Sequence, residues 1–274
     1  MKLLNLSIPL IMKIFVLGCN GMAGHLISLY FCEKGYKVTG FARSESRFVP
    51  TIVGDAYDTS LLSTSIIDND FDVVINCIGM LNQFAENDKA AAVFMNGYLP
   101  HFLAKITENI GTRIIHMSTD CVFSGNTGPY SELSFPDGKS YYDRTKAMGE
   151  IVDSKNLTLR NSIVGPDIKE NGIGLLNWFM QQNGQVNGYT KAMWTGQTTL
   201  QLAKTMEVAM KAGATGLINA VPDSNISKYD LLNLFNRYLR NNQLIINPVD
   251  GVVLDKTLVR TNYELDYIIP DYET

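Results

Sequence analysis

Short apolar runs alternate with amphipathic segments along the first 165 residues of the chain. This alternation predicts βαβ units that build a parallel sheet. The run "DVVINCIG" is rich in Val and Ile, which indicates a strand buried on both faces. The predicted strands cover 13–18, 36–43, 72–79, 113–118 and 157–165, and the predicted helices cover 23–35, 89–108 and 141–155.

The pattern loosens after Gly165. The stretches 166–174 and 181–197 are rich in Gly, Asn and Gln, which predicts loops on either side of a short helix at 175–181. Regular elements then return, with Ser227 as the predicted N-cap of the last helix. These elements are a helix at 198–213, a strand at 215–221 and a helix at 227–240.

The order of these elements predicts an α/β fold: a Rossmann-like, doubly wound parallel sheet with a small C-terminal substrate-binding lobe. We expect the lobe to fold over the carboxyl edge of the sheet. The expected division is a dinucleotide-binding domain at 12–165 to which 198–221 returns, a lobe made of 166–197 and 222–274, and an N-terminal extension at 1–11.

The stretch "GCNGMAG" leaves the first strand and opens the first helix. In that context Gly18 permits a tight turn, Gly21 lets the backbone approach a pyrophosphate, and Gly24 allows close helix–strand packing. The helix N-terminus then presents N–H groups and its positive dipole end to the phosphates. A glycine-rich turn without a ligand is the alternative.

The end of the second strand, "GFARSESR", distinguishes the two nicotinamide cofactors. It offers Arg43, Ser44 and Arg47 but no carboxylate at its tip to accept from a ribose 2′-hydroxyl. Because arginine pairs with a 2′-phosphate, NADP(H) is favoured, with NAD(H) as the alternative. Asp55 follows, either to accept from the adenine amino group or to cap a helix.

Composition excludes several other classes of protein. The net charge of −4 and pI near 5.4 leave no basic stripe for nucleic acid. The four scattered cysteines favour a reducing compartment, and neither they nor the three histidines have metal-site spacing. The first 13 residues resemble a signal peptide, but they lead into a core strand without a cleavage site. We therefore expect a cytoplasmic protein with no membrane span and no metal.

Tyr142 and Lys146 are four positions apart in "YYDRTKAMGE", which places both on one face of a helix. Lowering a tyrosine pKa from about 10 to about 7 needs roughly 4 kcal/mol, which a nearby ammonium can supply. We predict that Lys146 lowers the pKa of Tyr142, so that Tyr142 protonates an alkoxide as hydride reaches a carbonyl carbon. Thr119 follows the strand 113–118 and can hydrogen-bond the same carbonyl.

The glycine loop, strand-end hydroxyl and YxxxK helix occur in an order that resembles the extended short-chain dehydrogenase/reductase family. The segments "HMSTDCVFSG", "YYDRTKAMGE", "LRNSIVGP" and "TTLQLAK" are most similar to dTDP-4-dehydrorhamnose reductases and related nucleotide-sugar 4-reductases. The resemblance implies Thr119, Tyr142 and Lys146 as the catalytic triad, a supporting role for Asn96, and a homodimer. The implied dinucleotide contacts are Gly18, Asn20, Gly21, Met22, Gly24, Arg43, Ser44, Arg47, Asp55, Ala56, Cys77, Ile78, Gly79, Ser162 and Val164.

The substrate side carries fewer signals. Asp120 and Trp194 are candidates for hydrogen bonds to a sugar and stacking on it, and Lys191 is a candidate for a diphosphate. Cys121 stands where the relatives usually have tyrosine, and the chain lacks their usual final helix. We therefore keep Cys121 as a substrate-side position with a packing role rather than as a nucleophile.

By this resemblance the expected activity is NADPH-dependent reduction of the 4-keto group of a nucleotide-linked deoxysugar, for surface polysaccharides. One alternative is a non-catalytic NADP-binding regulatory subunit, as in the β subunit of methionine adenosyltransferase. Another is a nucleotide-sugar epimerase or dehydratase, although "STDCVF" lacks the acidic pair of the dehydratases.

Overall fold

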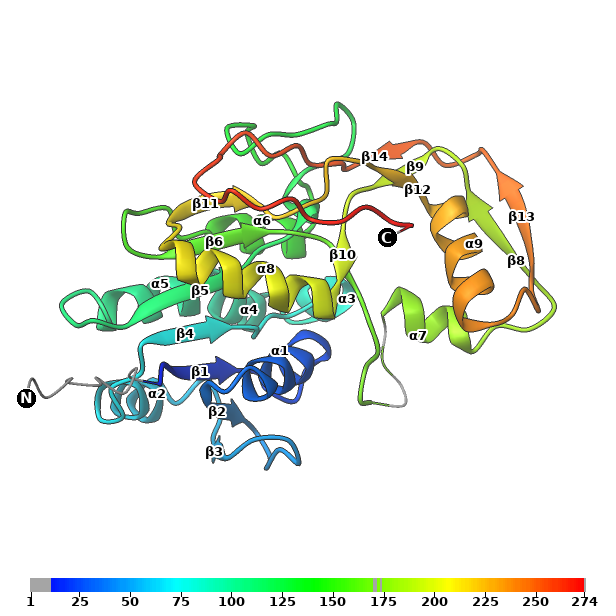
Figure 1. The fold of residues 1–274 in the computed structure, drawn as a ribbon. Coiled ribbons are helices and arrows are strands. Elements are labelled where there is room, and N and C mark those ends of the chain that lie inside the picture. The colour runs from blue at the N-terminus through cyan, green and yellow to red at the C-terminus, as the bar shows by residue number, and fades with distance from the viewer. Residues whose placement is uncertain (1–10, 170–171, 173, 274) are drawn as a thin grey trace, which may run out of the picture.

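A seven-stranded parallel sheet forms the centre of the molecule (Figure 1). The computed structural model describes residues 11–169, 172 and 174–273. The strand order is β11-β6-β5-β4-β1-β2-β3, and it reverses direction on either side of β1. The predicted α/β, Rossmann-like sheet is therefore confirmed. Its strands are β1 (Lys13–Leu17), β2 (Lys37–Ala42), β3 (Thr51–Val53), β4 (Val73–Asn76), β5 (Arg113–Met117), β6 (Leu157–Arg160) and β11 (Gly216–Asn219).

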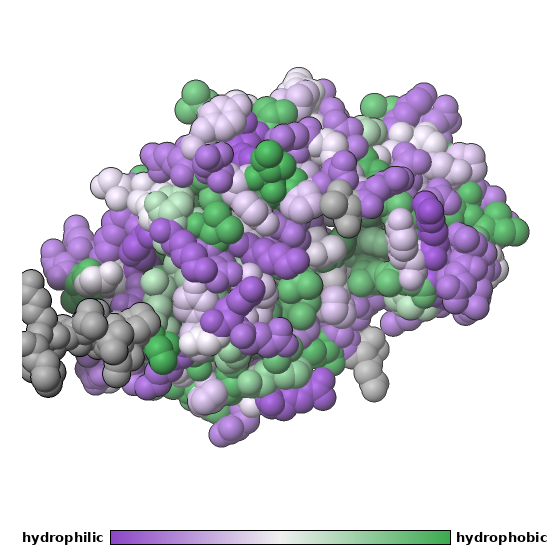
Figure 2. All heavy atoms as spheres, in the orientation of Figure 1, coloured by the Kyte–Doolittle hydropathy of each residue, from purple (hydrophilic) through white to green (hydrophobic). Residues whose placement is uncertain are grey.

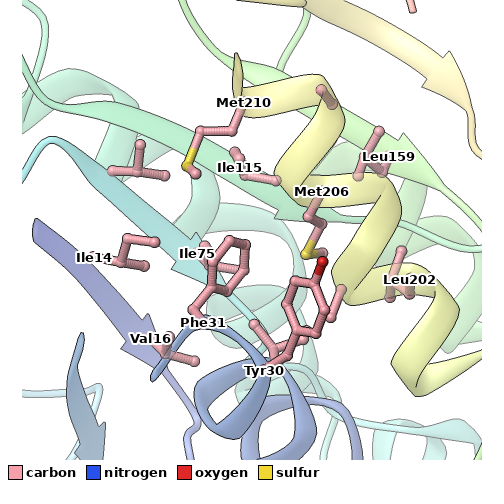
Figure 3. Close-up of a cluster of buried hydrophobic side chains, with 14 of the residues drawn as sticks. Ile14, Val16, Tyr30, Phe31, Ile75, Ile115, Leu159, Leu202, Met206 and Met210 are labelled. Carbon is pink, nitrogen blue, oxygen red and sulfur yellow. The ribbon is translucent and has the colours of Figure 1, made fainter. Parts of the chain in front are cut away.

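Helices cover both faces of this sheet because alternate residues of each strand point to opposite sides. In β1, Ile14 and Val16 join one core cluster, whereas Phe15 and Leu17 join the other, all with no exposed surface. The first cluster includes residues of α1 (Met22–Glu33) and α8 (Thr199–Ala212), as Figure 3 shows. The second includes residues of α2 (Thr59–Ile67) and α5 (Leu99–Ile106). Each fully buried large apolar side chain contributes about 1.5–3 kcal/mol.

The predicted helix at 89–108 is continuous but not uniform. It consists of α4 (Lys89–Ala92), a π-helical turn η1 (Val93–Tyr98) and α5, and it follows the short helix α3 (Asn82–Asn87). Pro100 follows the π turn and has no N–H to donate to the carbonyl of Asn96 four residues earlier, so the regular α pattern is interrupted at this point. The widened turn places Asn96, which is fully buried, toward the sheet.

Helix α6 (Tyr141–Met148) is shorter than the predicted 141–155. It begins with a capping box in which the Ser140 side chain accepts from Asp143 N–H, and the Asp143 carboxylate accepts from Ser140 N–H. It ends at Gly149, where a Cβ would overlap the Asn96 carbonyl oxygen. The close contact between these two elements thus sets the length of the helix.

The lobe lies beyond the carboxyl ends of the central strands (Figure 1). The prediction that 181–197 forms loops is wrong, since this stretch contributes three strands. Two of these strands pair with segments much later in the sequence. In one pair, Gln185 is in register with Ile245. The lobe elements are α7 (Leu175–Met180), β8 (Gln185–Tyr189), β9 (Ala192–Trp194), β12 (Ile226–Ser227), α9 (Lys228–Leu239), β13 (Ile245–Val249) and β14 (Leu254–Asp255).

Two further features concern the predicted domain division. A short parallel pair, β7 (Ile163–Val164) and β10 (Gln197–Thr198), precedes α8, which packs beside α1. Leu265 and Ile269 pack in the core cluster of β1, so part of the predicted lobe segment 222–274 lies on the main domain. The predicted extension 1–11 falls, except for Ile11, outside the described residues.

Hydrophilic residues dominate the face of the molecule in Figure 2, and hydrophobic residues form only small groups among them. Among the helices that the structure describes, none is both long and apolar enough to cross a membrane.

Candidate active site

The glycine loop has the geometry that its sequence predicts. Gly18 has a φ of +77°, and the N–H of Gly21 donates to its carbonyl at 2.9 Å. A Cβ at Gly24 would overlap that same carbonyl oxygen, so α1 can approach β1 only with glycine there. No described side chain caps α1 at Gly21, and its first turn has no acidic residue. The N–H groups and dipole of α1 therefore fit a pyrophosphate.

The tip of β2 lies beside this loop. The Asn20 side-chain amide donates to the Ser44 carbonyl at 3.0 Å, while Arg43 and Ser44 are exposed. Ser44 Oγ accepts from the same amide at 3.4 Å and keeps its proton to donate, so both exposed side chains can meet a 2′-phosphate. The Arg47 guanidinium instead lies over the Phe48 ring, 4.8 Å from its centroid.

The remaining predicted dinucleotide contacts follow β3 and β4 at the same edge of the sheet. Asp55 accepts from Tyr57 N–H at 3.0 Å, and the N-cap of α2 is Asp58, so the helix-cap alternative for Asp55 is wrong. Ala56 is buried, and Cys77, Ile78 and Gly79 follow β4 directly. A Cβ at Gly18 would lie 3.2 Å from Ile78 Cγ1, which places this segment against the glycine loop. The residues lie where the strand order reverses, the usual ligand position in open α/β sheets.

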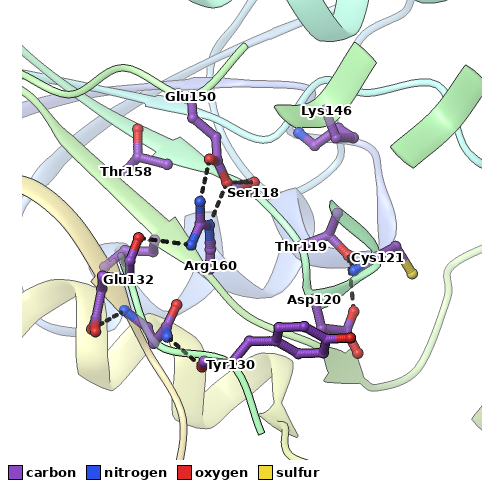
Figure 4. A network of polar contacts seen from close by, with 12 residues as sticks. Ser118, Thr119, Asp120, Cys121, Tyr130, Glu132, Lys146, Glu150, Thr158 and Arg160 are labelled. Atoms are coloured by element: carbon purple, nitrogen blue, oxygen red, sulfur yellow. Dashed lines mark hydrogen bonds and ion pairs between the residues drawn. The ribbon is translucent and has the colours of Figure 1, made fainter. Parts of the chain in front are cut away.

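Tyr142, Lys146 and Thr119 are buried together where α6 crosses the end of β5. The Lys146 Nζ donates to the Met117 carbonyl at 2.6 Å and lies 3.5 Å from His116 Nε2. Thr119 Oγ1 accepts from Cys121 N–H at 3.1 Å. Figure 4 shows Lys146 and Thr119 on these adjacent elements. The sequence spacing and the strand-end position therefore do bring the three predicted side chains into one region.

The electrostatics differ from the prediction. Burial raises the pKa of Tyr142 above its ordinary value, and Cys121 adds to this, whereas a hydrogen bond with Thr119 opposes it. Burial also lowers the pKa of Lys146 to about 8. This arrangement does not produce the predicted fall in the Tyr142 pKa, because desolvation exceeds any effect of the cation. Tyr142 is thus the protonated phenol at neutral pH, which is the form that a proton donor needs.

Asn96 fixes the loop after β4 to the helix that carries Tyr142. Its side-chain oxygen accepts from Met80 N–H at 2.7 Å. Its amide nitrogen donates to the Met80 carbonyl at 3.0 Å and to Thr145 Oγ1 at 3.1 Å. Asn96 therefore supports the site through α6, as the sequence resemblance implies.

The structure contains a buried ion pair between Arg160 and Glu150 that the sequence analysis did not predict. Arg160 binds Glu150 through two hydrogen bonds of 2.7 Å, and Ser118 Oγ donates to the same carboxylate at 2.7 Å (Figure 4). Arg160 also donates to the Glu132 carbonyl at 3.3 Å. The network connects β6, the end of α6 and the loop after β5. A charged residue in the otherwise uncharged central strand "LTLR" is the signal that could have revealed it.

The predicted substrate-side residues fall into two groups. Asp120 is buried, and burial raises the pKa of its carboxyl, which Lys228 and Lys256 oppose. Burial likewise raises the pKa of the Cys121 thiol to about 12, in agreement with a packing role. Lys191 is exposed and pairs with Asp250 of the lobe at 3.2 Å.

Trp194 is buried rather than open to solvent. Its indole N–H donates to Ser162 Oγ at 2.7 Å, and Lys228 Nζ lies 4.7 Å from the ring centroid. Ser162 and Val164 are at the junction with the lobe, so Trp194 joins these two predicted dinucleotide contacts to the lobe. Lys228, at the start of α9, was not predicted. The described residues contain no cluster of His, Cys, Asp or Glu that could hold a metal ion.

Comparison with known proteins assigns the fold and the family. The sequence profile of the RmlD substrate binding domain matches residues 12–248. The probable low-salt glycan biosynthesis reductase Agl14 of Haloferax volcanii is 29% identical over 234 residues, which is 80% of this chain and 77% of that protein. A solved dTDP-4-dehydrorhamnose reductase of Bacillus anthracis, in complex with NADP, superposes with a TM-score of 0.76 over 92% of both chains, at 16% identity.

Two other relatives match only part of the chain. The dTDP-4-dehydrorhamnose reductase of Mycobacterium tuberculosis is 32% identical over 43% of this chain. The methionine adenosyltransferase 2 subunit beta of Xenopus laevis is 28% identical over 50% of this chain. Each match spans 41% of the relative's own length.

Proposed function

The chain belongs to the RmlD substrate binding domain family, and we propose that it reduces the 4-keto group of a nucleotide-linked deoxysugar with NADPH. The observation that carries this proposal is the position of Tyr142, Lys146 and Thr119. They are buried together at the carboxyl edge of the sheet that also holds the glycine loop.

Each of the three side chains has a separate task in this reaction. NADPH supplies the hydride when it is bound. Tyr142, whose phenol is protonated at neutral pH, donates a proton to the oxygen of the reacting carbonyl. The Thr119 hydroxyl donates to Asp120 Oδ1 at 3.0 Å in this structure and would turn to donate to the same oxygen. Lys146 holds the nicotinamide ribose.

Three features support NADP(H) as the cofactor. The N–H groups of α1 fit the pyrophosphate, exposed Arg43 and Ser44 fit a 2′-phosphate, and the position directly after β2 is held by Arg43 rather than by a carboxylate. The related Bacillus anthracis reductase was solved with NADP. NAD(H) remains the alternative cofactor.

The relatives support a sugar as the substrate. One is named as a probable glycan biosynthesis reductase and another as a dTDP-4-dehydrorhamnose reductase. We infer that the products enter surface glycans and that the enzyme works in the cytoplasm as a homodimer. Asp120 and Lys228, which interact electrostatically, are the charged side chains that we propose for the sugar side.

Turnover tests this function directly. Purified protein should oxidise NADPH with at least one 4-keto-6-deoxysugar from a panel linked to dTDP, GDP or UDP. Tyr142→Phe should lower kcat by about 10²–10⁴-fold while NADPH affinity is unchanged, because only the proton donor is lost.

Tyr141→Phe is the matched control. The Tyr141 ring is half-buried against Lys89, 4.7 Å from its ammonium, so its hydroxyl should not affect kcat. Equal rates for Tyr142→Phe and the parent would exclude the mechanism.

A regulatory NADP-binding subunit is the second candidate, because the methionine adenosyltransferase 2 subunit beta is a relative. This candidate predicts NADPH binding without turnover of any sugar in the panel. The buried Tyr142–Thr119–Lys146 group favours the enzyme, since a regulator does not need a proton donor there.

A further inference from the structure

We propose that His116 is a positioning residue for Lys146: Asn76 holds the ring so that Nε2–H faces the Lys146 amine and controls its protonation. Asn76 and His116 are in register on the neighbouring strands β4 and β5, and both are fully buried. The inference rests on the role of Lys146 in the proposed function.

The orientation of the Asn76 amide follows from a backbone contact. Its Oδ1 lies 3.1 Å from the backbone nitrogen of Ile78. A backbone N–H can only donate, so the oxygen of the amide must face it. The amide nitrogen is therefore the atom that lies 3.2 Å from His116 Nδ1.

This contact determines the tautomer of His116. The Asn76 amide nitrogen can only donate, so His116 Nδ1 must accept and carries no proton. Burial keeps the pKa of His116 well below its ordinary value, and the ring is neutral. A neutral imidazole without a proton on Nδ1 carries it on Nε2, which points to Lys146.

An N–H that faces Lys146 disfavours the ammonium form. An ammonium has three donors and no lone pair, so Nε2–H and Nζ–H would face each other across 3.5 Å. A neutral amine can accept from Nε2–H and still donate to the Met117 carbonyl at 2.6 Å. The contact therefore acts in the same direction as burial, which lowers the pKa of Lys146 to about 8.

The other titratable groups around Lys146 act on the same equilibrium. Glu150 on the C-terminal side of α6 and Cys77 after β4 favour the ammonium, Tyr142 lies one turn away on α6, and His101 of α5 acts on His116. None of these groups has an oriented N–H directed at Nζ. Lys146 holds the nicotinamide ribose in the proposed reaction, and its ammonium form brings the most donors to that contact. His116 therefore contributes to the pH at which activity falls on the alkaline side.

The tautomer can be observed without cofactor or substrate. Two-bond ¹H–¹⁵N spectra of the protein alone should show the His116 proton on Nε2. Resonances of Lys146, assigned with Lys146→Met, should report its titration in the same sample. A His116 proton on Nδ1 would overturn the proposal, even if the protein reduces sugars as expected.

Asn76→Asp is designed to reverse the tautomer. One carboxylate oxygen can still accept from Ile78 N–H, while the other accepts from Nδ1–H and leaves Nε2 as an acceptor for the ammonium. The pKa of Lys146 should then rise by about one unit or more, a tenfold change in its ionisation constant, and the alkaline limb of kcat should move by the same amount.

His116→Gln is the second variant, since its amide can turn its oxygen to Nζ; we expect a smaller shift in the same direction. His101→Gln is the control, because this exposed histidine contacts the Met148 carbonyl at 2.8 Å, acts on His116 only through its charge and does not contact Lys146. We expect no comparable shift of the Lys146 titration in this variant. An unchanged Lys146 titration in the folded variants of both Asn76 and His116 would refute the inference. A failure of sugar reduction alone would refute only the proposed function.

Discussion

The cofactor edge of the main sheet and the C-terminal lobe are built on different principles. At the cofactor edge, contacts between neighbours in sequence determine the backbone: Gly18, Gly21 and Gly24 form one turn within seven residues. In the lobe, β8 pairs with β13, and β9 with β12 and β14, so its shape depends on contacts between distant segments. The cofactor edge can therefore be inferred from a sequence motif. The strand pairing of the lobe cannot, because it joins segments that share no local sequence pattern.

The largest effect should come from Gly24→Ala. The added methyl group would overlap the Gly18 carbonyl and push α1 away from β1, so NADPH binding, measured by fluorescence titration, should be lost. Gly251→Ala in the lobe is the control, since nothing lies within 4 Å of a Cβ there. Retained NADPH affinity in Gly24→Ala would show that the loop is not the phosphate site.

The next effect concerns stability. Glu150→Gln removes one charge of a buried pair whose side chains are 2% and 6% exposed, and leaves Arg160 with no anionic partner. We expect a loss of about 3–5 kcal/mol in the free energy of unfolding, measured by urea denaturation. Asp250→Asn breaks the exposed Lys191–Asp250 pair of the lobe and should leave the unfolding midpoint unchanged. Similar losses of unfolding free energy in Glu150→Gln and Asp250→Asn would contradict the expected difference between the main domain and the lobe.

The smallest effect should come from Arg43→Ala. Loss of one charged hydrogen bond, worth about 1.5–3 kcal/mol, should lower the preference for NADPH over NADH by about tenfold or more. The measurement is kcat/KM for both cofactors, and the KM for the sugar should stay constant because Arg43 lies at the tip of β2. An unchanged cofactor preference would assign the 2′-phosphate to another group.

The sequence predicted the main domain well because its signals are local. The glycine turn and the Ser227 cap appear at their predicted positions, and the predicted strands and helices of the main domain are present. The prediction contained neither β3 nor α2, and it extended α6 seven residues too far. The strand β8 was missed because it buries only Val186 and Gly188, which give little apolar periodicity. The pKa of Tyr142 was predicted in the wrong direction because burial cannot be inferred from the spacing of Tyr142 and Lys146.

The π turn at Asn96 has a consequence for aligning or redesigning this helix. A turn that holds one additional residue rotates everything after it by about 100° relative to a regular helix. A helical wheel drawn straight through Pro100 would thus assign the residues of α5 to the wrong sides. Deleting one residue from Val93–Tyr98 would restore the regular phase and, in the same step, turn Asn96 away from Met80 and Thr145.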